Sequence, residues 1–202
     1  AQLFAKLEHP QILPVYDFGT HQGESFLVMR FLDNSQSLEA IIREKRLSYS
    51  DILFIARQLA ILLDYFKEQD MVHGDFSPQN FLIDNQLQPY VYNLVVSTAQ
   101  TALSEIEQDG IAGSPPYIAP ETFLGQAVDH RADLYSFGIL LYECFTGKKP
   151  FDGEFPLAMG QISAEMGVNF VRDGSGAMRD MAFKSQLPSV RESNSDLPIA
   201  ID

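Results

Sequence analysis

Five short motifs follow one another along this chain, in an order that leaves little freedom in how it can fold. The central motif is His73-x-Asp75-x-x-x-x-Asn80. Two motifs precede it and two follow it, at residues 7–13, 26–29, 113–121 and 133–138. Each motif is weak evidence by itself, because short patterns recur by chance. Their order and spacing together constrain the fold much more strongly.

The apolar residues between the motifs predict both helices and strands. Ser48, with Asp51 three positions later, resembles a capping box and opens a helix that runs to about Gln69. A second buried helix is expected at 133–145, ending before Gly147. Shorter elements are expected as a helix at 38–44 and as strands at 12–18, 25–31, 81–83 and 90–96, with a hairpin turn at 19–24.

The motifs resemble those of a eukaryotic-type Ser/Thr protein kinase domain, and the segment 15–19 is similar to bacterial members of that family. The resemblance covers about residues 1–158. It implies an α+β, protein-kinase-like fold, mostly the helical C-lobe. Residues 1–32 would be the end of the N-lobe, with the tail of helix C, two strands and the hinge, and residues 33–202 would be the C-lobe. Residues 160–180 would be an inserted loop, and the final helices would be missing.

A second family competes, because Gly74 stands where protein kinases usually carry arginine. Small-molecule kinases of the aminoglycoside and choline phosphotransferase type share the kinase-like fold and commonly have His-Gly-Asp in this loop. They lack the Ala-Pro-Glu segment that this chain carries at 119–121, before Asp133. Ala-Pro-Glu alone is also an ordinary proline-led helix start. Its position between the other motifs favours the protein-kinase family.

The resemblance implies roles for six residues. Asp75 would be the catalytic base that accepts the proton of a Ser/Thr hydroxyl, and Asn80 would hold a Mg²⁺ ion. Met29 would guard the back of the adenine pocket for ATP. Phe31 and Leu32 belong to the hinge at 30–32, whose backbone would pair with adenine, and Leu82 would lie under the adenine ring. ATP and Mg²⁺ are the cofactors of the family.

The same resemblance gives His73 a structural role beneath the loop. It would stack with Phe4, Val15 and Leu94 as a spine that joins the lobes. Asp133 would anchor the base of that spine. These residues also have a plain interpretation as core residues, and the two interpretations agree.

The chain departs from the family where the chemistry takes place. Asn93 stands at the position of the Mg²⁺-binding aspartate, so the metal site would consist of Asn80 and Asn93. A neutral amide offers a much weaker oxygen ligand to Mg²⁺ than a carboxylate does. Ser77 replaces the lysine that contacts the transferred phosphate, and Gly74 replaces the arginine that responds to phosphorylation of the activation loop. A weakened metal site is therefore expected.

Two other aspartates could in principle replace the missing carboxylate. Asp84 follows Asn80 by only four residues, inside a predicted turn. Asp109 lies too close to Glu121 to leave room for an activation segment. Both are rejected as substitutes for Asn93.

The composition of the chain limits the classes of molecule that it is expected to bind. With 27 acidic and 14 basic residues the net charge is −13 and the pI about 4.6, which argues against nucleic acid and anionic membrane surfaces. A protein substrate or signalling partner is expected instead. The single cysteine, Cys144, suits the reducing cytoplasm. Neither a signal peptide nor an apolar segment long enough to span a membrane is found.

Two hypotheses about function remain open. In the first, the chain is part of a catalytically impaired protein kinase domain, a pseudokinase with a role in signalling or scaffolding. In the second, the full-length protein is an active ATP-dependent Ser/Thr kinase that Asn93 only weakens. Residues 1–202 alone are expected to be inactive under both hypotheses, because no Gly-rich loop or strand lysine matches the family's phosphate site.

Overall fold

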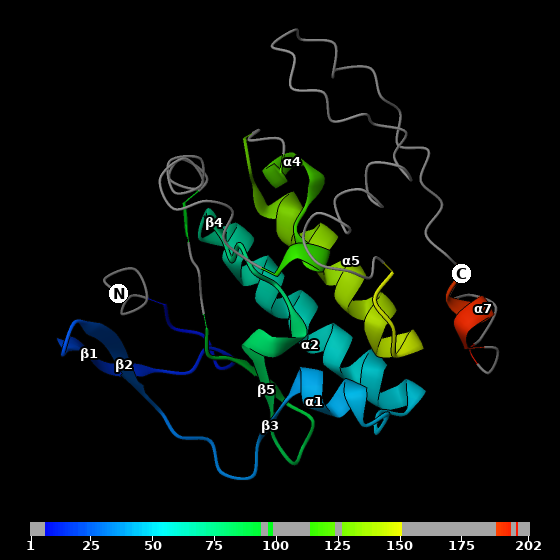
Figure 1. The fold of residues 1–202 in the computed structure, drawn as a ribbon, viewed down its shortest axis with the longest axis horizontal. Coiled ribbons are helices and arrows are strands. Elements are labelled where there is room, and N and C mark those ends of the chain that lie inside the picture. The colour runs from blue at the N-terminus through cyan, green and yellow to red at the C-terminus, as the bar shows by residue number, and fades with distance from the viewer. Residues whose placement is uncertain are drawn as a thin grey trace, which may run out of the picture.

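The computed structural model describes residues 7–93, 97–98, 114–123, 127–150, 189–194 and 197. The strands are β1 (Val15–His21), β2 (Glu24–Met29), β3 (Gln36–Ser37), β4 (Met71–Val72), β5 (Phe81–Ile83), β6 (Pro89–Val91) and β7 (Ser97–Thr98). The α-helices are α1 (Leu38–Arg43), α2 (Tyr49–Glu68), α4 (Pro120–Phe123), α5 (His130–Thr146) and α7 (Val190–Ser193), with 3₁₀ turns at Pro78–Asn80 and Pro115–Tyr117. Helices α2 and α5 pack side by side, and the β1–β2 hairpin lies apart from them (Figure 1).

Helix α2 contributes one apolar face to the core. Its first turn carries the predicted capping box, in which the Ser48 hydroxyl accepts the N–H of Asp51 and the Asp51 carboxylate accepts the N–H of Ser48. The buried positions repeat at the spacing of an amphipathic helix, as predicted: Ile52, Ile55, Leu59, Leu62, Leu63 and Phe66. Fully burying a side chain of this size stabilises the fold by roughly 2 kcal/mol.

Helix α5 begins three residues earlier than predicted. Asp129 caps it by accepting the N–H of Arg131, so the helix starts at His130 rather than at Asp133. Its end agrees with the prediction, since Gly147 adopts the left-handed conformation (φ 68°) that terminates helices. Asp133 therefore lies one turn inside the helix, where its side chain is 2% exposed.

A small three-stranded sheet, in the order β3-β5-β6, lies beside these helices. In β6 only residues 89–91 form a strand, whereas the sequence predicted a strand over 90–96. Residues 94–96 are outside the described part of the chain. A separate pair, β4 with β7, places Val72 opposite Ser97.

The β1–β2 hairpin confirms the predicted pair of strands, with bounds shifted by a few residues. Its turn is the two residues 22–23, and Phe18 lies opposite Leu27 in the register. Gly19 lies under the ring of Phe26, where a Cβ atom would be 2.7 Å from a ring carbon, so a larger residue would displace that ring.

Several predicted features fall outside the described residues. These are the tail of helix C before Leu7, the inserted loop at 160–180 and the region of the final helices. Within the part that is described, no helix has the length and apolar character needed to cross a membrane.

Candidate active site

The loop with the central motif connects β4 to β5, and Asp133 on α5 anchors it through hydrogen bonds to its backbone. The Asp133 carboxylate accepts the backbone N–H of His73 at 2.7 Å and that of Gly74 at 3.0 Å. Burial raises the pKa of Asp133 to about 6, although the two N–H donors act in the opposite direction. The anchoring contact expected for Asp133 is confirmed.

His73 is fully buried among aromatic rings. Its ring lies edge-on to Phe66 and Phe76, with centroid distances of 5.7 and 5.5 Å, and its Nδ1 accepts the N–H of Asp75. Burial lowers the pKa of His73 to about 4, against a smaller opposing effect of the Asp75 charge. The imidazole is therefore neutral at pH 7, and it stabilises the loop through its ring contacts and its hydrogen bond with the N–H of Asp75. Of the other predicted spine members, Phe4 and Leu94 are outside the described residues, and Val15 begins β1.

We expect the stability of the protein to fall on acidification because of His73. Its pKa is about 4 in the folded state against an ordinary value of 6.5, so the unfolded chain binds the extra proton between these values. Relative to a His73→Phe variant, the wild type should lose up to about 3 kcal/mol as the pH falls from 6.5 to 4. Urea unfolding of both proteins across this range measures the difference, and a gap independent of pH would contradict it.

Asp75, the predicted base, contacts a hydroxyl of its own chain. Its carboxylate accepts the backbone N–H of Ser114 at 3.1 Å and lies 3.5 Å from the Ser114 hydroxyl. The Gln79 side-chain amide donates to the same hydroxyl at 2.5 Å. Ser114 was not singled out from the sequence, although it belongs to the motif at 113–121. The side chain of Asp75 is nearly buried, with 8% exposure.

Asn80 and Asn93, the predicted metal ligands, are brought together by the fold and bind each other. The Asn80 amide N–H₂ donates to the carbonyl of Asp75 at 2.8 Å and to the Ser77 hydroxyl at 3.2 Å. This fixes which side of the amide is oxygen. That oxygen, Oδ1 of Asn80, accepts the side-chain N–H of Asn93 at 3.0 Å. The atom that would bind a metal is thus already used by a hydrogen bond.

These contacts do not fit a Mg²⁺ site. Mg²⁺ in proteins is bound through carboxylates and keeps near-octahedral geometry. Here the two amides face each other, and Asp75 is engaged by Ser114. In the described part of the chain no group of three or more His, Cys, Asp or Glu could hold a metal ion. Asp84 does not replace the missing ligand, because its carboxylate closes the β5–β6 turn by accepting the N–H groups of Gln86 and Gln88.

The residues predicted to contact adenine lie on two elements. Met29 ends β2, and Phe31 and Leu32 follow it in the connection to β3, whereas Leu82 lies in the middle of β5. Phe31 is 83% exposed, and Met29, Leu32 and Leu82 are half-buried. Their role in nucleotide binding stays a prediction.

A buried polar pair that the sequence did not predict joins the motif at 113–121 to α5. The Tyr117 hydroxyl donates to the carboxylate of Glu143, and the Ser136 hydroxyl donates to the Tyr117 carbonyl at 2.7 Å. Burial is the main cause that raises the pKa of both Tyr117 and Glu143. Tyr117 and Glu143 are 26 positions apart, and no local pattern marks such a contact.

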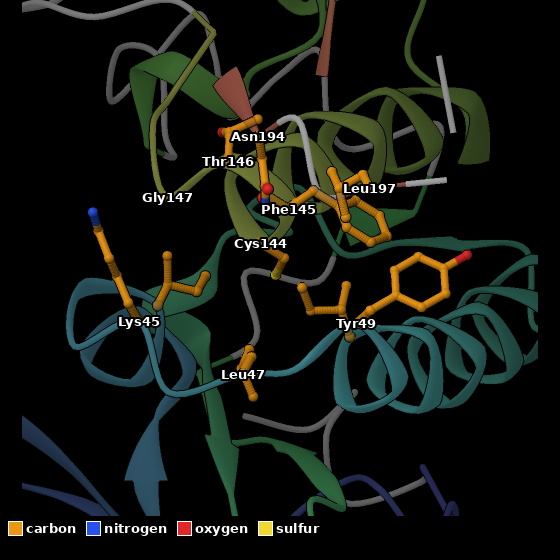
Figure 2. Close-up of a pocket in the computed structure, with 11 residues that line it drawn as sticks. Lys45, Leu47, Tyr49, Cys144, Phe145, Thr146, Gly147, Asn194 and Leu197 are labelled. Carbon is orange, nitrogen blue, oxygen red and sulfur yellow. The ribbon is translucent and has the colours of Figure 1, made fainter. Parts of the chain in front are cut away.

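A cavity of about 390 Å³ lies at the other end of the helices (Figure 2). It is lined by the end of α1, the start of α2, the end of α5 and the segment around residue 194, and Tyr49, Cys144 and Leu197 are among its walls. None of the predicted site residues lines it. Burial raises the pKa of the Cys144 thiol, so this cysteine is a poor nucleophile at neutral pH.

The family model of the protein kinase domain matches residues 1–186, so the chain belongs to the protein kinase family. The α+β, kinase-like fold expected from the motifs is thereby confirmed.

The chain is similar to bacterial serine/threonine-protein kinases. It is 30% identical to PrkC of Bacillus subtilis over 167 residues, which are 82% of this chain and 26% of the relative. It is 32% identical to pkn2 of Myxococcus xanthus over 162 residues, covering 77% of the chain and 19% of the relative. It is 30% identical to PknH of Mycobacterium tuberculosis over 151 residues, which are 75% of this chain and 24% of the relative. The chain thus spans about a quarter or less of the length of these relatives.

Proposed function

We propose that this chain is part of a Ser/Thr protein-kinase-like domain whose catalytic function is impaired, and that it serves as a binding module in cytoplasmic signalling or scaffolding. Residues 1–32 would belong to the N-lobe and residues 33–202 to the C-lobe. The partner would be a protein. The net charge of −13 supports a protein partner over a nucleic acid, because nucleic acids select basic surfaces.

One observation carries this proposal, the hydrogen bond from Asn93 to Oδ1 of Asn80. Phosphoryl transfer depends on metal ions that neutralise the charge on the phosphates. A metal entering here would have to break this amide pair and would gain only neutral oxygens. Losing a charged ligand in this way costs several kcal/mol of transition-state stabilisation, which is about a thousandfold in rate.

The melting temperature of the protein, measured over a series of ATP concentrations with and without Mg²⁺, tests the proposal. We expect that Mg²⁺ will not raise the melting temperature. A ligand stabilises a protein only if it binds the folded state, and we expect the folded state not to bind Mg²⁺. Transfer of labelled phosphate to a generic protein substrate and to itself should be absent for the full-length protein, which is the form to assay because residues 1–202 alone are expected to be inactive under both hypotheses. Asp75→Ala is the control for that assay, since the variant removes the predicted base.

The competing proposal is that the full-length protein is an active ATP-dependent Ser/Thr kinase. It is favoured by Asp75, which keeps the predicted base in the loop. Mg²⁺-dependent stabilisation, together with phosphate transfer that disappears in Asp75→Ala, would support this alternative and overturn the first proposal. Transfer that persists in Asp75→Ala would indicate a contaminating kinase.

A further inference from the structure

Tyr92 lies between β6 and Asn93, at the edge of the candidate active site. Its hydroxyl donates to the backbone carbonyl of Gln79 at 2.7 Å, and its backbone N–H donates to the carbonyl of Asn80 at 3.3 Å. The next residue, Asn93, donates to Oδ1 of Asn80. Residues 92–93 are therefore bonded to residues 79–80, at the end of the loop with the central motif.

The pairing of β5 with β6 puts Tyr92 on the same face of the sheet as Leu82, the residue predicted to lie under adenine. Leu82 lies opposite Tyr90 in the register, and side chains alternate between the two faces along each strand. Phe81 and Val91, on the other face, are fully buried. Leu82, Tyr90 and Tyr92 are half-buried. A diagonal neighbour across two strands is about 7–8 Å away, within reach of an aromatic side chain, so Tyr92 stands beside Leu82.

A nucleotide in this site would pass over the position of Tyr92. Its base would lie over Leu82, and its phosphates would extend toward Asn80. These two residues are two positions apart, which is about 7 Å in an extended chain. The sugar, which joins the base to the phosphates, has to fit within that length. The side chain of Tyr92 extends across the same segment, because its hydroxyl reaches the carbonyl of Gln79.

The hydrogen bond of Tyr92 fixes its side chain in this position. The carbonyl of Gln79 accepts the tyrosine hydroxyl, and the side-chain amide of Gln79 donates to the Ser114 hydroxyl at 2.5 Å. A ribose lying over residues 79–82 would bring hydroxyl groups that need acceptors of the same kind. A ligand with a sugar would therefore have to break the bond of Tyr92 and displace its ring, whereas a planar base over Leu82 would not.

We propose that Tyr92 occupies the sugar position of the nucleotide site and thereby excludes adenosine and its phosphates. The inference rests on the proposed function, because it takes the adenine ring to lie over Leu82. A planar base without a sugar is still accepted. The exclusion acts on the ligand directly and needs no metal, so it is separate from the amide pair of Asn80 and Asn93. Tyr92 then decides the class of ligand, a base rather than a nucleotide.

Calorimetric titration of the full-length protein with adenosine and with adenine, both in EDTA, tests the proposal. Tyr92→Ala removes the ring and should tighten adenosine binding at least about tenfold, because the ligand no longer has to displace a half-buried side chain. Adenine binding should change by less than about twofold, because the base does not reach Tyr92. Tyr92→Phe removes only the hydroxyl and should tighten adenosine binding about threefold, the effect of one hydrogen bond.

Tyr65→Ala is the matched control for these titrations. Tyr65 is also half-buried and its hydroxyl also bonds a backbone group, the N–H of Glu8 at 3.1 Å, but it lies on α2, so this variant should bind both ligands as the wild type does. Tyr92→Thr also clears the ring and suits an extended backbone, and it replaces Tyr92→Ala if that variant does not fold.

Three results would overturn the proposal. These are equal adenosine affinities in the wild type and Tyr92→Ala, an adenine affinity that rises as much as the adenosine affinity, and no adenosine binding by any Tyr92 variant. Because neither Mg²⁺ nor phosphate transfer enters these titrations, such a failure is distinguishable from a failure of the proposed function, which the Mg²⁺ response of the wild type tests.

Discussion

Asn93→Asp should give the protein a Mg²⁺ response that the wild type lacks. The carboxylate cannot donate to Oδ1 of Asn80, so the amide pair opens and two oxygens face each other. Without metal, this repulsion should lower the free energy of unfolding by roughly 1 kcal/mol. With metal, the charged ligand should tighten Mg²⁺ binding on the order of a hundredfold.

The measurement is the melting temperature of each protein in EDTA and over a series of Mg²⁺ concentrations. Asn93→Ala is the control, because it also frees Oδ1 of Asn80 but adds no carboxylate. It should lose stability in EDTA and show no recovery with Mg²⁺. If Mg²⁺ raised the melting temperature of the wild type as much as that of Asn93→Asp, the amide pair would not block the metal site.

Asp133→Ala should be the most destabilising single substitution around the loop, with a loss of about 3 kcal/mol. It removes the acceptor of two backbone N–H groups, and the one on His73 is buried where no water replaces the lost oxygen. The loop with Asp75 loses its anchor to α5 at the same time. Urea unfolding at pH 7 measures the loss, and hydrogen exchange at His73 shows whether the loop opens.

Asp133→Asn removes the charge and one of the two acceptor oxygens. Each oxygen of Asp133 accepts one backbone N–H, and the amide NH₂ cannot accept, so this variant should lose about 1–2 kcal/mol at pH 7, less than Asp133→Ala. Because burial raises the pKa of Asp133 to about 6 from 3.8, the folded wild type takes up a proton between these values. The wild type should therefore gain stability relative to Asp133→Asn as the pH falls from 6 to 4. An Asn variant as unstable as the Ala variant would show that a single acceptor oxygen does not hold the loop.

Local patterns were sufficient for most of the secondary structure. The capping box at Ser48, the apolar face of α2 and the glycine that ends α5 each depend on residues within a few positions of one another. The start of α5 was missed because Asp129, which caps it, precedes the motif at 133–138 and belongs to no apolar pattern. The strand predicted over 90–96 was too long, because β6 ends at Val91.

The candidate site was predictable only in part. The motifs identified Asp75, Asn80 and Asn93 by resemblance, and their catalytic roles stay predictions. No pattern indicated that Ser114 would cover Asp75, since the two residues are 39 positions apart and hydroxyl side chains are common in loops. The bond between Tyr117 and Glu143 was missed for the same reason.

By itself, the sequence determined the family and the position in the chain at which the chemistry departs from it. That information lies in residue types and spacings, and Asn93 is an amide whatever its surroundings. The tertiary structure decided what the amide does. A hydrogen bond needs its donor and acceptor about 3 Å apart, and only the fold brings the side chain of Asn93 to Oδ1 of Asn80. The substitution removes a charge, and the amide that stands there donates a hydrogen bond to the oxygen of Asn80.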